Sequence, residues 1–321
     1  MGQTFSRDLS VSWQIIITTL QAMRKSEILD NPTLAVVSTA RDTQDCSQRA
    51  AQADNGVSVQ AARPAHREVE ECVREGIQPV IMPTMEQVAA AKAKVQYQDG
   101  LFHFAVAGIA GSGKSSLINA FRGLPNNHRD AARTGVVETT SSIGRYPDPK
   151  PEYPFVWYDI PGAGTLAQPD WEYFNNQGLF VFDCIIVLFD SRFTETDAAI
   201  LTNCKRFQIP TYIVRAKADI HIDNIISDIV DPDDNEDEDE DSNEGLYQSL
   251  YVQAREQFVA ATRATVASNL GNAGLPDQRV YCISKKALLS MKRGRLLPEV
   301  IDEVELIKDI LEEARSRRCV V

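Results

Sequence analysis

Positive charge is scarce in this 321-residue sequence, which has 33 Lys and Arg residues against 45 Asp and Glu residues and a net charge of −12. Nucleic-acid binding needs a basic surface that displaces counterions from phosphates, so we expect no nucleic-acid partner. The sequence also lacks the ~18 consecutive uncharged apolar residues of a membrane-spanning helix. The nearest candidate, Leu179 to Phe189, contains Asp183 and is expected to be a buried strand.

The negative charge is concentrated in one segment. Ten acidic residues lie within 231–244, and without them the net charge changes from −12 to −2. Residues 218–254 contain no Lys or Arg. We predict an acidic insertion at about 228–246 in an otherwise nearly neutral chain, and it would be either a solvated loop or a contact for a basic partner.

Cysteine patterns that mark metal or disulfide sites are also missing. The six cysteines form no C-x-x-C pair and have no metal-ligand spacing with the four histidines. Cys184 and Cys282 lie in apolar runs and are expected to be buried and reduced, as in a reducing compartment. The sequence therefore predicts a cytoplasmic location, either free or peripheral on a membrane.

The N-terminus carries a lipidation pattern. MGQTFS fits M-G-x-x-x-[ST], with Gly2 as the acceptor of a myristoyl group, and an ordinary solvated terminus is the alternative. Because one acyl chain binds a membrane only marginally, a second contact would be required. The apolar stretch at 11–25 could supply it or could pack on the main domain.

The chain divides by its patterning. We expect an N-terminal extension at 1–63, partly disordered, then a helical lead-in at 64–100 and a short tail at 316–321. In the lead-in, Thr84 and Gln87 have capping-box spacing and predict a helix that begins there and ends before Asp99.

From residue 101 to 315, apolar strands alternate with amphipathic helices. This pattern predicts an α/β fold with a doubly wound, mostly parallel sheet flanked by helices. The last helix is expected to begin at Pro298. The predicted strands are Phe102–Ala107, Phe155–Tyr158, Cys184–Phe189, Thr211–Arg215 and Val280–Ile283.

A G-x-x-x-x-G-K-S sequence spans residues 108–115, between the apolar FHFAVA and the helical SSLINAF. In such a P-loop, glycines let the backbone approach phosphates and the amides that open the helix bind them. Lys114 would reach the β- and γ-phosphates, and Ser115 would bind Mg²⁺. A plain glycine turn would need neither residue. The predicted phosphate contacts are Gly108, Ala110, Gly111, Ser112, Gly113, Lys114, Ser115 and Ser116.

Three later segments indicate a guanine nucleotide. Asp159-Ile-Pro-Gly162 is a D-x-x-G element, in which Asp159 would contact Mg²⁺ and the amide of Gly162 the γ-phosphate. Ala216-Lys217-Ala218-Asp219 matches [NT]-K-x-D at three positions, and Asp219 would accept hydrogen bonds from guanine that adenine cannot donate. Ser284-Lys285 occupies the place of the last base-contact loop. Each segment alone is weak, but their order after successive strands predicts GTP and GDP as ligands.

With these segments assembled, the sequence resembles the immunity-related, or interferon-inducible, GTPases from about Ile77 to Arg315. The resemblance rests on AGSGKSSLINAFRGL, TGVVETT, WYDIPGAG and IVRAKAD, and GLFHFAVAG and FDCIIVLFD resemble fungal members. From the residues alone, either Thr139 or Thr140 could be the switch threonine that binds Mg²⁺. The resemblance implies Thr140, and it places on Glu138 a glutamate that acts in hydrolysis across a nucleotide-to-nucleotide dimer.

The resemblance implies a dynamin-like GTPase that hydrolyses GTP to GDP and phosphate with Mg²⁺. Ala163 stands where many small GTPases have a water-orienting Gln, so we expect slow turnover unless a homodimer through the nucleotide face, or another partner, supplies the missing group. The alternative is a nucleotide-dependent binding module with negligible turnover. Well-studied members have a helical region after the G domain, and none of its properties is carried over to this sequence, which ends at Val321. The predicted catalytic residues are Lys114, Glu138, Thr140 and Gly162.

Overall fold

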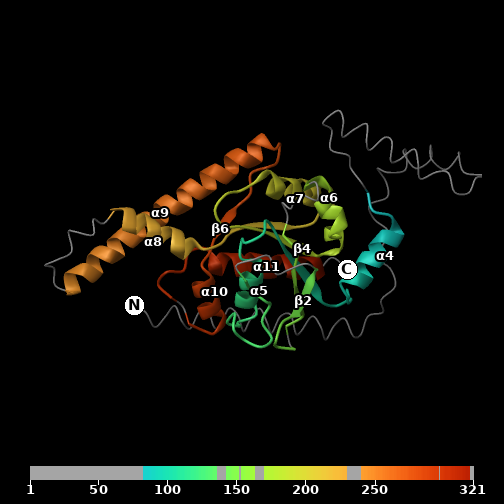
Figure 1. The fold of residues 1–321 in the computed structure, drawn as a ribbon, viewed down its shortest axis with the longest axis horizontal. Helices are drawn as coiled ribbons and strands as arrows, with labels where there is room; N and C mark the ends of the chain where they lie inside the picture. Colours follow the sequence, from blue (N-terminus) through green and yellow to red (C-terminus); the bar gives the residue numbers. More distant parts are fainter. Residues whose placement is uncertain are drawn as a thin grey trace, which may run out of the picture.

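The computed structural model describes residues 82–135, 142–151, 153–162, 170–229, 240–295 and 297–318 (Figure 1). Several predicted features lie outside these residues: the N-terminal extension with Gly2, the lead-in before residue 82, the switch residues Glu138, Thr139 and Thr140, and Ala163.

A six-stranded sheet forms the centre of the fold, in the order β2-β3-β1-β4-β5-β6. All neighbouring strands are parallel except β2 and β3, which pair antiparallel. Because β1, β3, β4, β5 and β6 run in one direction, their carboxyl ends meet at one edge of the sheet. The strands are β1 (Phe102–Ala107), β2 (Gly144–Pro147), β3 (Phe155–Asp159), β4 (Cys184–Phe189), β5 (Thr211–Arg215) and β6 (Val280–Cys282).

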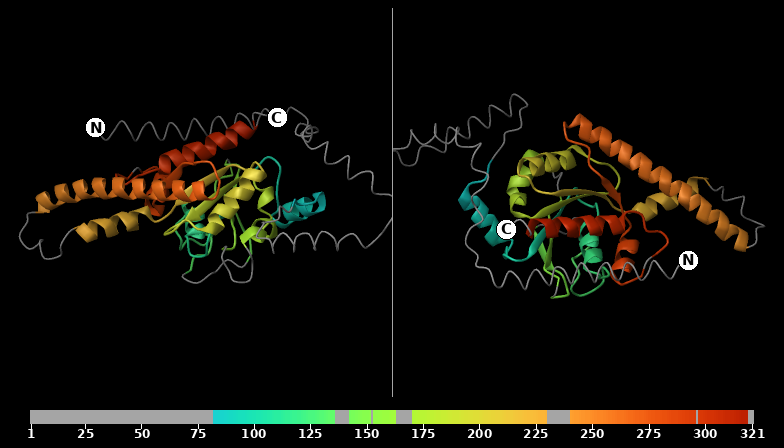
Figure 2. Two further views of the ribbon diagram at one scale, coloured as in Figure 1. Left: turned by 90° about the horizontal axis from the view of Figure 1, so that it is seen from above. Right: turned by 180° about the vertical axis from the view of Figure 1, so that it is seen from behind.

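Helices cover both faces of the sheet (Figure 2). The core on one face takes residues from α5, α10 and α11, and the core on the other takes them from α6, α7 and the C-terminal part of α9. No helix in the described part of the chain is both long and apolar enough to cross a membrane. The helices are α4 (Met85–Lys94), α5 (Lys114–Phe121), α6 (Asp170–Asn176), the 3₁₀ helix η1 (Leu179–Val181), α7 (Glu195–Arg206), α8 (Ala218–Ile229), α9 (Glu240–Asn272), α10 (Lys285–Lys292) and α11 (Glu303–Arg318).

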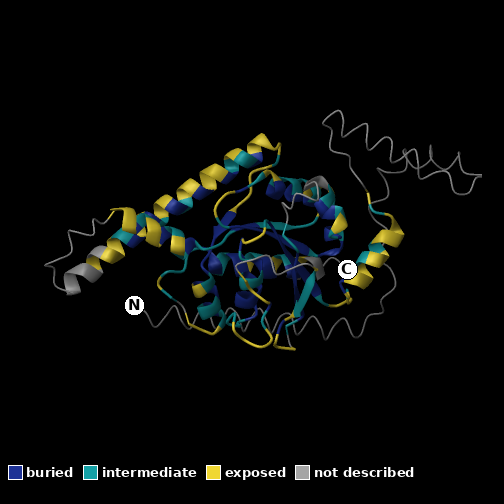
Figure 3. Ribbon diagram, in the orientation of Figure 1, coloured by how far each residue is buried: buried dark blue, intermediate teal, exposed yellow. Residues whose placement is uncertain are grey.

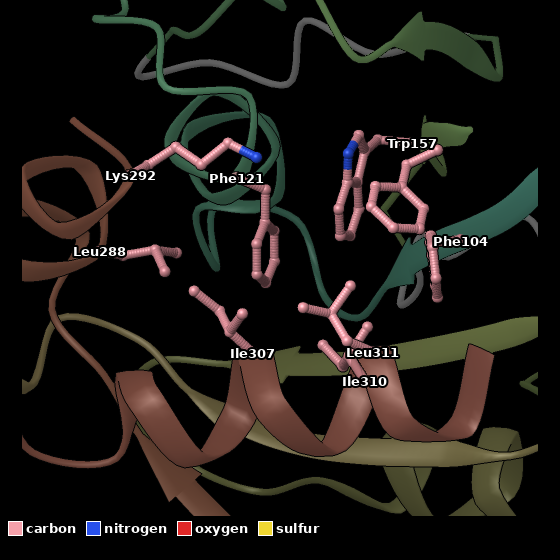
Figure 4. Close-up of a pocket in the computed structure, with 9 residues that line it drawn as sticks. Phe104, Phe121, Trp157, Leu288, Lys292, Ile307, Ile310 and Leu311 are labelled. Atoms are coloured by element: carbon pink, nitrogen blue, oxygen red, sulfur yellow. The ribbon is translucent and has the colours of Figure 1, made fainter. Parts of the chain in front are cut away.

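The first core face contains stacked aromatic rings next to a small apolar cavity of about 20 Å³ (Figure 4). Phe121 of α5 stacks on Trp157 of β3, with ring centroids 4.3 Å apart and an interplanar angle of 4°. Ile307 and Leu311 of α11 reach the same cavity from the opposite side. This packing fixes α5, and with it the loop that precedes α5, against the sheet.

The lead-in is bound to the sheet by a buried polar network. The ring of His103 of β1 is hydrogen-bonded through Nδ1 to the hydroxyl of Tyr158 at 2.9 Å and through Nε2 to the carbonyl oxygen of Gln98 at 3.0 Å. Asp183 accepts from the amide of His103 at 2.7 Å and from the hydroxyl of Tyr97 at 3.0 Å. Residues 95–103 are therefore continuous with the domain, while the helix α4 before them has no buried residue (Figure 3).

The expected α/β fold is confirmed, and most strand predictions agree within one residue. The capping box of Thr84 and Gln87 is present, and the helix it begins ends at Lys94. Cys184 and Cys282 are buried and free, as expected. The edge strand β2 was not predicted, because its sequence GRYP has neither an apolar run nor alternation.

Four expectations need correction. Leu179–Val181 is a 3₁₀ helix rather than strand, since Gly178 before it adopts φ 66° and the strand begins only at Cys184. The acidic insertion overlaps regular structure: residues 228 and 229 end α8, and residues 240–246 already belong to α9. Acidic residues are favourable at the start of a helix, where the dipole is positive.

The last helix begins at Glu303 and not at Pro298, because Asp302 fixes the preceding segment to β6 by accepting from the amide of Cys282 at 2.9 Å. This helix continues to Arg318, so the boundary expected at 315 falls inside it.

Candidate functional site

The loop at 108–115 joins β1 to α5 at the carboxyl edge of the sheet. Gly108 has φ 140°, and a Cβ there would lie 2.1 Å from the carbonyl oxygen of Leu188 in β4. Gly111 and Gly113 also have positive φ, at 81° and 95°, but their Cβ positions are open. The first glycine is therefore required by contact with the neighbouring strand, whereas the other two shape the turn.

Lys114 is the first residue of α5, directly after this loop. Its ammonium donates to the carbonyls of Ile109 at 2.9 Å and Gly108 at 3.2 Å, which holds the side chain along the loop. Gly113 is the N-cap of α5 and, among the described residues, no side chain caps the helix. The amides of the first turn can thus face an anion, which the helix dipole favours.

Ser115 and Asp159 come together from α5 and the end of β3, where the hydroxyl of Ser115 donates to Oδ2 of Asp159. Both groups are oxygen ligands of the kind Mg²⁺ prefers. A Cβ on Gly162 would lie 2.8 Å from the backbone and side chain of Ala110, so the D-x-x-G segment packs directly on the P-loop. The structure thus brings these two predicted elements into contact.

The two other serines among the predicted phosphate contacts have hydrogen-bond partners within the domain. Ser112 is fully buried, and its hydroxyl donates to the carbonyl of Ile109 at 3.0 Å. The hydroxyl of Ser116 accepts from the amide group of Asn126 at 3.0 Å. Ala110 and Gly111 are exposed at the outer surface of the loop.

Lys217 follows β5 in the left-handed conformation, with φ 59°. Its ammonium lies 2.6 Å from Oδ2 of Asp190, at the end of β4, and His221 contacts the carbonyl of Asp190 at 2.8 Å. Burial raises the pKa of Asp190, but the hydrogen bond and charge of Lys217 outweigh it, so the pKa lies below its ordinary value. Asp219 is half-buried in the first turn of α8, and the stem of Lys217 is fixed beside it.

The loops after β5 and β6 are joined through Ile283. Its amide donates to the carbonyl of Arg215 at 2.9 Å, and its carbonyl accepts from the amide of Ala218 at 3.1 Å. Ser284 is buried, and its hydroxyl caps α10 by accepting from the amides of residues 286 and 287. Lys285 begins α10 and is half-buried.

All described members of the predicted site thus lie at one edge of the sheet, after β1, β3, β5 and β6. Sequence reasoning missed Asp190 and Glu303, which hold Lys217 and Ser284 respectively. Asp190 follows the apolar run of β4 directly, and a polar residue at that position was a usable signal. Glu303 lies in a helix with many charged residues, and its sequence context gave no such signal.

A protein-family model matches the part of the chain that carries most of this site. The model described as "Interferon-inducible GTPase (IIGP)" matches residues 65–232, which is more than half of the chain. The chain belongs to the interferon-inducible GTPase family. The matched residues include the P-loop, the D-x-x-G segment and the loop of Asp219.

Mouse relatives are similar over different parts of this family member. Interferon-gamma-inducible GTPase 10 of Mus musculus is 27% identical over 260 residues, which cover 78% of this chain and 56% of the relative. Interferon-inducible GTPase 1 of Mus musculus is 35% identical over 137 residues, covering 42% of this chain and 33% of the relative. The matches therefore span from about a third to little more than half of the length of these two relatives.

Solved structures are more distant. LeoA, a bacterial dynamin GTPase from ETEC, is 16% identical with a TM-score of 0.42, and the match covers 78% of this chain and 41% of LeoA. In the family member described here, the P-loop between β1 and α5 and the mostly parallel sheet make the fold that of a P-loop NTPase.

Proposed function

We propose that this protein binds GTP and GDP with Mg²⁺ and hydrolyses GTP to GDP and phosphate as a dynamin-like switch. The observation that carries the proposal is the convergence of four segments, in the family's order, at one sheet edge. Open α/β sheets bind ligands at the carboxyl ends of their strands, beside the point where the strand order reverses. In this sheet that point lies between β1 and β4.

Phosphate binding is the role of the P-loop. Lys114 would turn from the loop carbonyls to the β- and γ-phosphates, and the amides of the first turn of α5 would bind the remaining oxygens. Ser115, Asp159 and Thr140 would hold Mg²⁺, which supplies positive charge against the phosphate oxygens. The contact of Gly162 with Ala110 lets the D-x-x-G segment respond to the γ-phosphate.

Guanine recognition is the role of the loops after β5 and β6. Asp219 would accept from the two guanine donors, and the stem of Lys217 would pack over the base because Asp190 fixes its ammonium. Ser284 and Lys285 would close the opposite side of the base. Ala216 lacks the side-chain hydrogen bond of the usual Asn or Thr, so loop rigidity rests on Ile283.

Turnover would depend on assembly. Ala163 has only a methyl group, which cannot orient the attacking water, and phosphoryl transfer depends on positioning. A second copy, docked through the nucleotide face, would bring Glu138 to the site. The alternative, a nucleotide-dependent binding module, predicts negligible turnover at every concentration.

Phosphate release from excess GTP, measured across a hundredfold range of protein concentration, tests this proposal. We expect turnover per molecule to rise with concentration and to stay low throughout for Glu138→Ala. Turnover that does not depend on concentration would reject the dimer, and release no faster than without protein would favour the binding module.

Membrane attachment is proposed through the N-terminus, on the basis of the MGQTFS pattern. The chain co-expressed with an N-myristoyltransferase should gain the mass of one myristoyl group and float with anionic vesicles, whereas Gly2→Ala should do neither. An unmodified mass for the parent chain would remove this part of the proposal.

The phrases GLFHFAVAG and FDCIIVLFD also support a fungal member of the family, which an alignment with fungal sequences tests.

A further inference from the structure

Glu303 is a fully buried carboxylate that lies at the base-recognition loops and has no role in the proposed chemistry. It opens α11, at the C-terminal end of the fold, 19 residues after Ser284. Oε1 accepts from the backbone amide of Ser284 at 2.7 Å, and Oε2 accepts from the amide of Ile301 at 2.6 Å. One carboxylate therefore bridges the last base-contact loop and the turn before α11.

Its neighbour Asp302 holds the strand that leads into this loop. Asp302 accepts from the amide of Cys282 at 2.9 Å and receives both Arg263 at 2.8 Å and Arg279 at 3.3 Å. Two successive acids thus bind the backbone of alternate residues, 282 and 284. This arrangement leaves the conformation of residues 282–284 little freedom.

Residues 282–284 also hold the segment after β5, which contains Asp219, in position. Ile283, between the two tethered residues, accepts from the amide of Ala218 at 3.1 Å, next to Asp219. A displacement of Ser284 would therefore move both loops that face the base. A hydrogen bond to a buried charged group is strong. Removal of the carboxylate would leave the buried amide without its acceptor, which costs free energy.

We propose that Glu303 is a positioning residue for guanine specificity, acting through the amide of Ser284 on the loops that carry Lys285 and Asp219. Because its side chain is fully buried, Glu303 would act on the nucleotide only through these loops. The inference rests on the proposed function, because it concerns how that same site reads its base.

The test compares the full-length chain with Glu303→Gln and Glu303→Ala, measuring affinities for GDP, IDP and ADP by competition against a fluorescent guanine nucleotide. Asp309→Asn is the matched control, since Asp309 lies on the same helix and accepts from the side-chain hydroxyl of Tyr281 at 2.5 Å rather than from a backbone amide of residues 282–284. We expect Glu303→Ala to weaken GDP binding about tenfold and to lower the preference for GDP over IDP and ADP. Glu303→Gln, which keeps one acceptor oxygen, should recover part of that preference, and Asp309→Asn should stay within about twofold of the parent.

Selectivity separates positioning from a merely structural effect, because partial unfolding lowers the affinity for all three nucleotides by the same factor. If Glu303→Ala does not fold, Glu303→Gln alone decides, with an expected loss of GDP preference of about threefold. Unchanged selectivity in the folded Glu303 variants, or an equal change in Asp309→Asn, would overturn the inference while leaving the proposed function intact. A parent chain that binds no nucleotide would overturn both.

Discussion

At the scale of single residues, the P-loop contains glycines that serve different purposes. Gly108 lies against the backbone of β4, where an added Cβ would meet a carbonyl oxygen at 2.1 Å. Gly111 has a positive φ of 81° but open space at the Cβ position. The G-x-x-x-x-G-K-S pattern identifies the loop but not this difference, which depends on a strand 80 residues later in the chain.

Gly108→Ala should therefore destabilise the folded chain more than Gly111→Ala. We expect losses of about 3 kcal/mol for Gly108→Ala, from backbone overlap, and about 1 kcal/mol for Gly111→Ala, from the left-handed conformation alone. Urea unfolding without nucleotide measures both. Equal losses of unfolding free energy in the two variants would show that β4 shifts to make room for the extra methyl group.

Glu303 should make stability depend on pH. Burial raises the pKa of Glu303 to about 7, against the lowering effect of its backbone donors, from an ordinary value of 4.5. Between these values the Glu303 side chain binds more protons in the folded chain than in the unfolded chain, so the stability that this group contributes is fully present below about pH 4.5 and is lost as pH rises through about 7. The contribution is about 3 kcal/mol.

Glu303→Gln removes this titration. The free energy of unfolding of the variant relative to the parent should rise from pH 4.5 to pH 7 and stay level above, as measured by urea unfolding at each pH. A difference that does not vary with pH would mean that the carboxylate titrates alike in both states.

At the scale of elements, a buried ion pair joins α10 to the chain after β2. The ammonium of Lys292 lies 3.4 Å from Oδ2 of Asp148, with side-chain exposures of 11% and 1%. Burial lowers the pKa of Lys292, while the nearby carboxylate opposes that change. The pair therefore links α10, which follows Ser284, to the segment directly after β2.

Breaking this pair from one side should be costly. We expect Lys292→Met or Asp148→Asn alone to lose about 3 kcal/mol, because each removes the partner of a buried charge. The double variant should lose less than the sum of the two, by more than about 1 kcal/mol, in a double-mutant cycle from denaturant unfolding. Additive losses would indicate that the two side chains act independently.

The elements that could be predicted are those whose pattern is local. Continuous apolar runs identified the five parallel strands, and Thr84 and Gln87 identified a helix start. Local pattern did not reveal β2, which exists by pairing with β3, or the start of α11, which depends on the bond from Asp302 to β6. The site followed the same rule: residues in motifs were predicted, whereas Glu303 is a functional candidate only through its contact with Ser284, which is distant in sequence.

At the scale of the whole molecule, the main acidic run and the predicted site residues lie in different segments of the sequence. Residues 231–239 contain seven acids, and without them the net charge of −12 becomes −5. The helices on either side, α8 and α9, pack together through the cluster that contains Ile222 and Tyr251. The fold of this pair therefore rests on apolar contacts outside the acidic run.

Replacing the seven acids of 231–239 by Ser should change neither fold nor ligand affinity. We expect the melting temperature to stay within about 2 °C and the GDP affinity within about twofold at physiological salt, because none of the seven acids is a predicted site residue and salt screens charge interactions beyond ~8 Å. Calorimetry and nucleotide titration measure these quantities. A gain in GDP affinity of tenfold or more would show that the seven acids repel the nucleotide electrostatically.

The central claim is that this chain reads guanine through Asp219, and exchange of its preferred base tests it most directly. Affinities for GTP, XTP and ATP should be measured for the parent chain and for Asp219→Asn. The parent should prefer GTP, and the variant should lose GTP affinity at least tenfold and gain XTP affinity, because an amide presents a donor to the xanthine oxygen. A parent chain that prefers ATP, or a variant with unchanged GTP affinity, would contradict the claim.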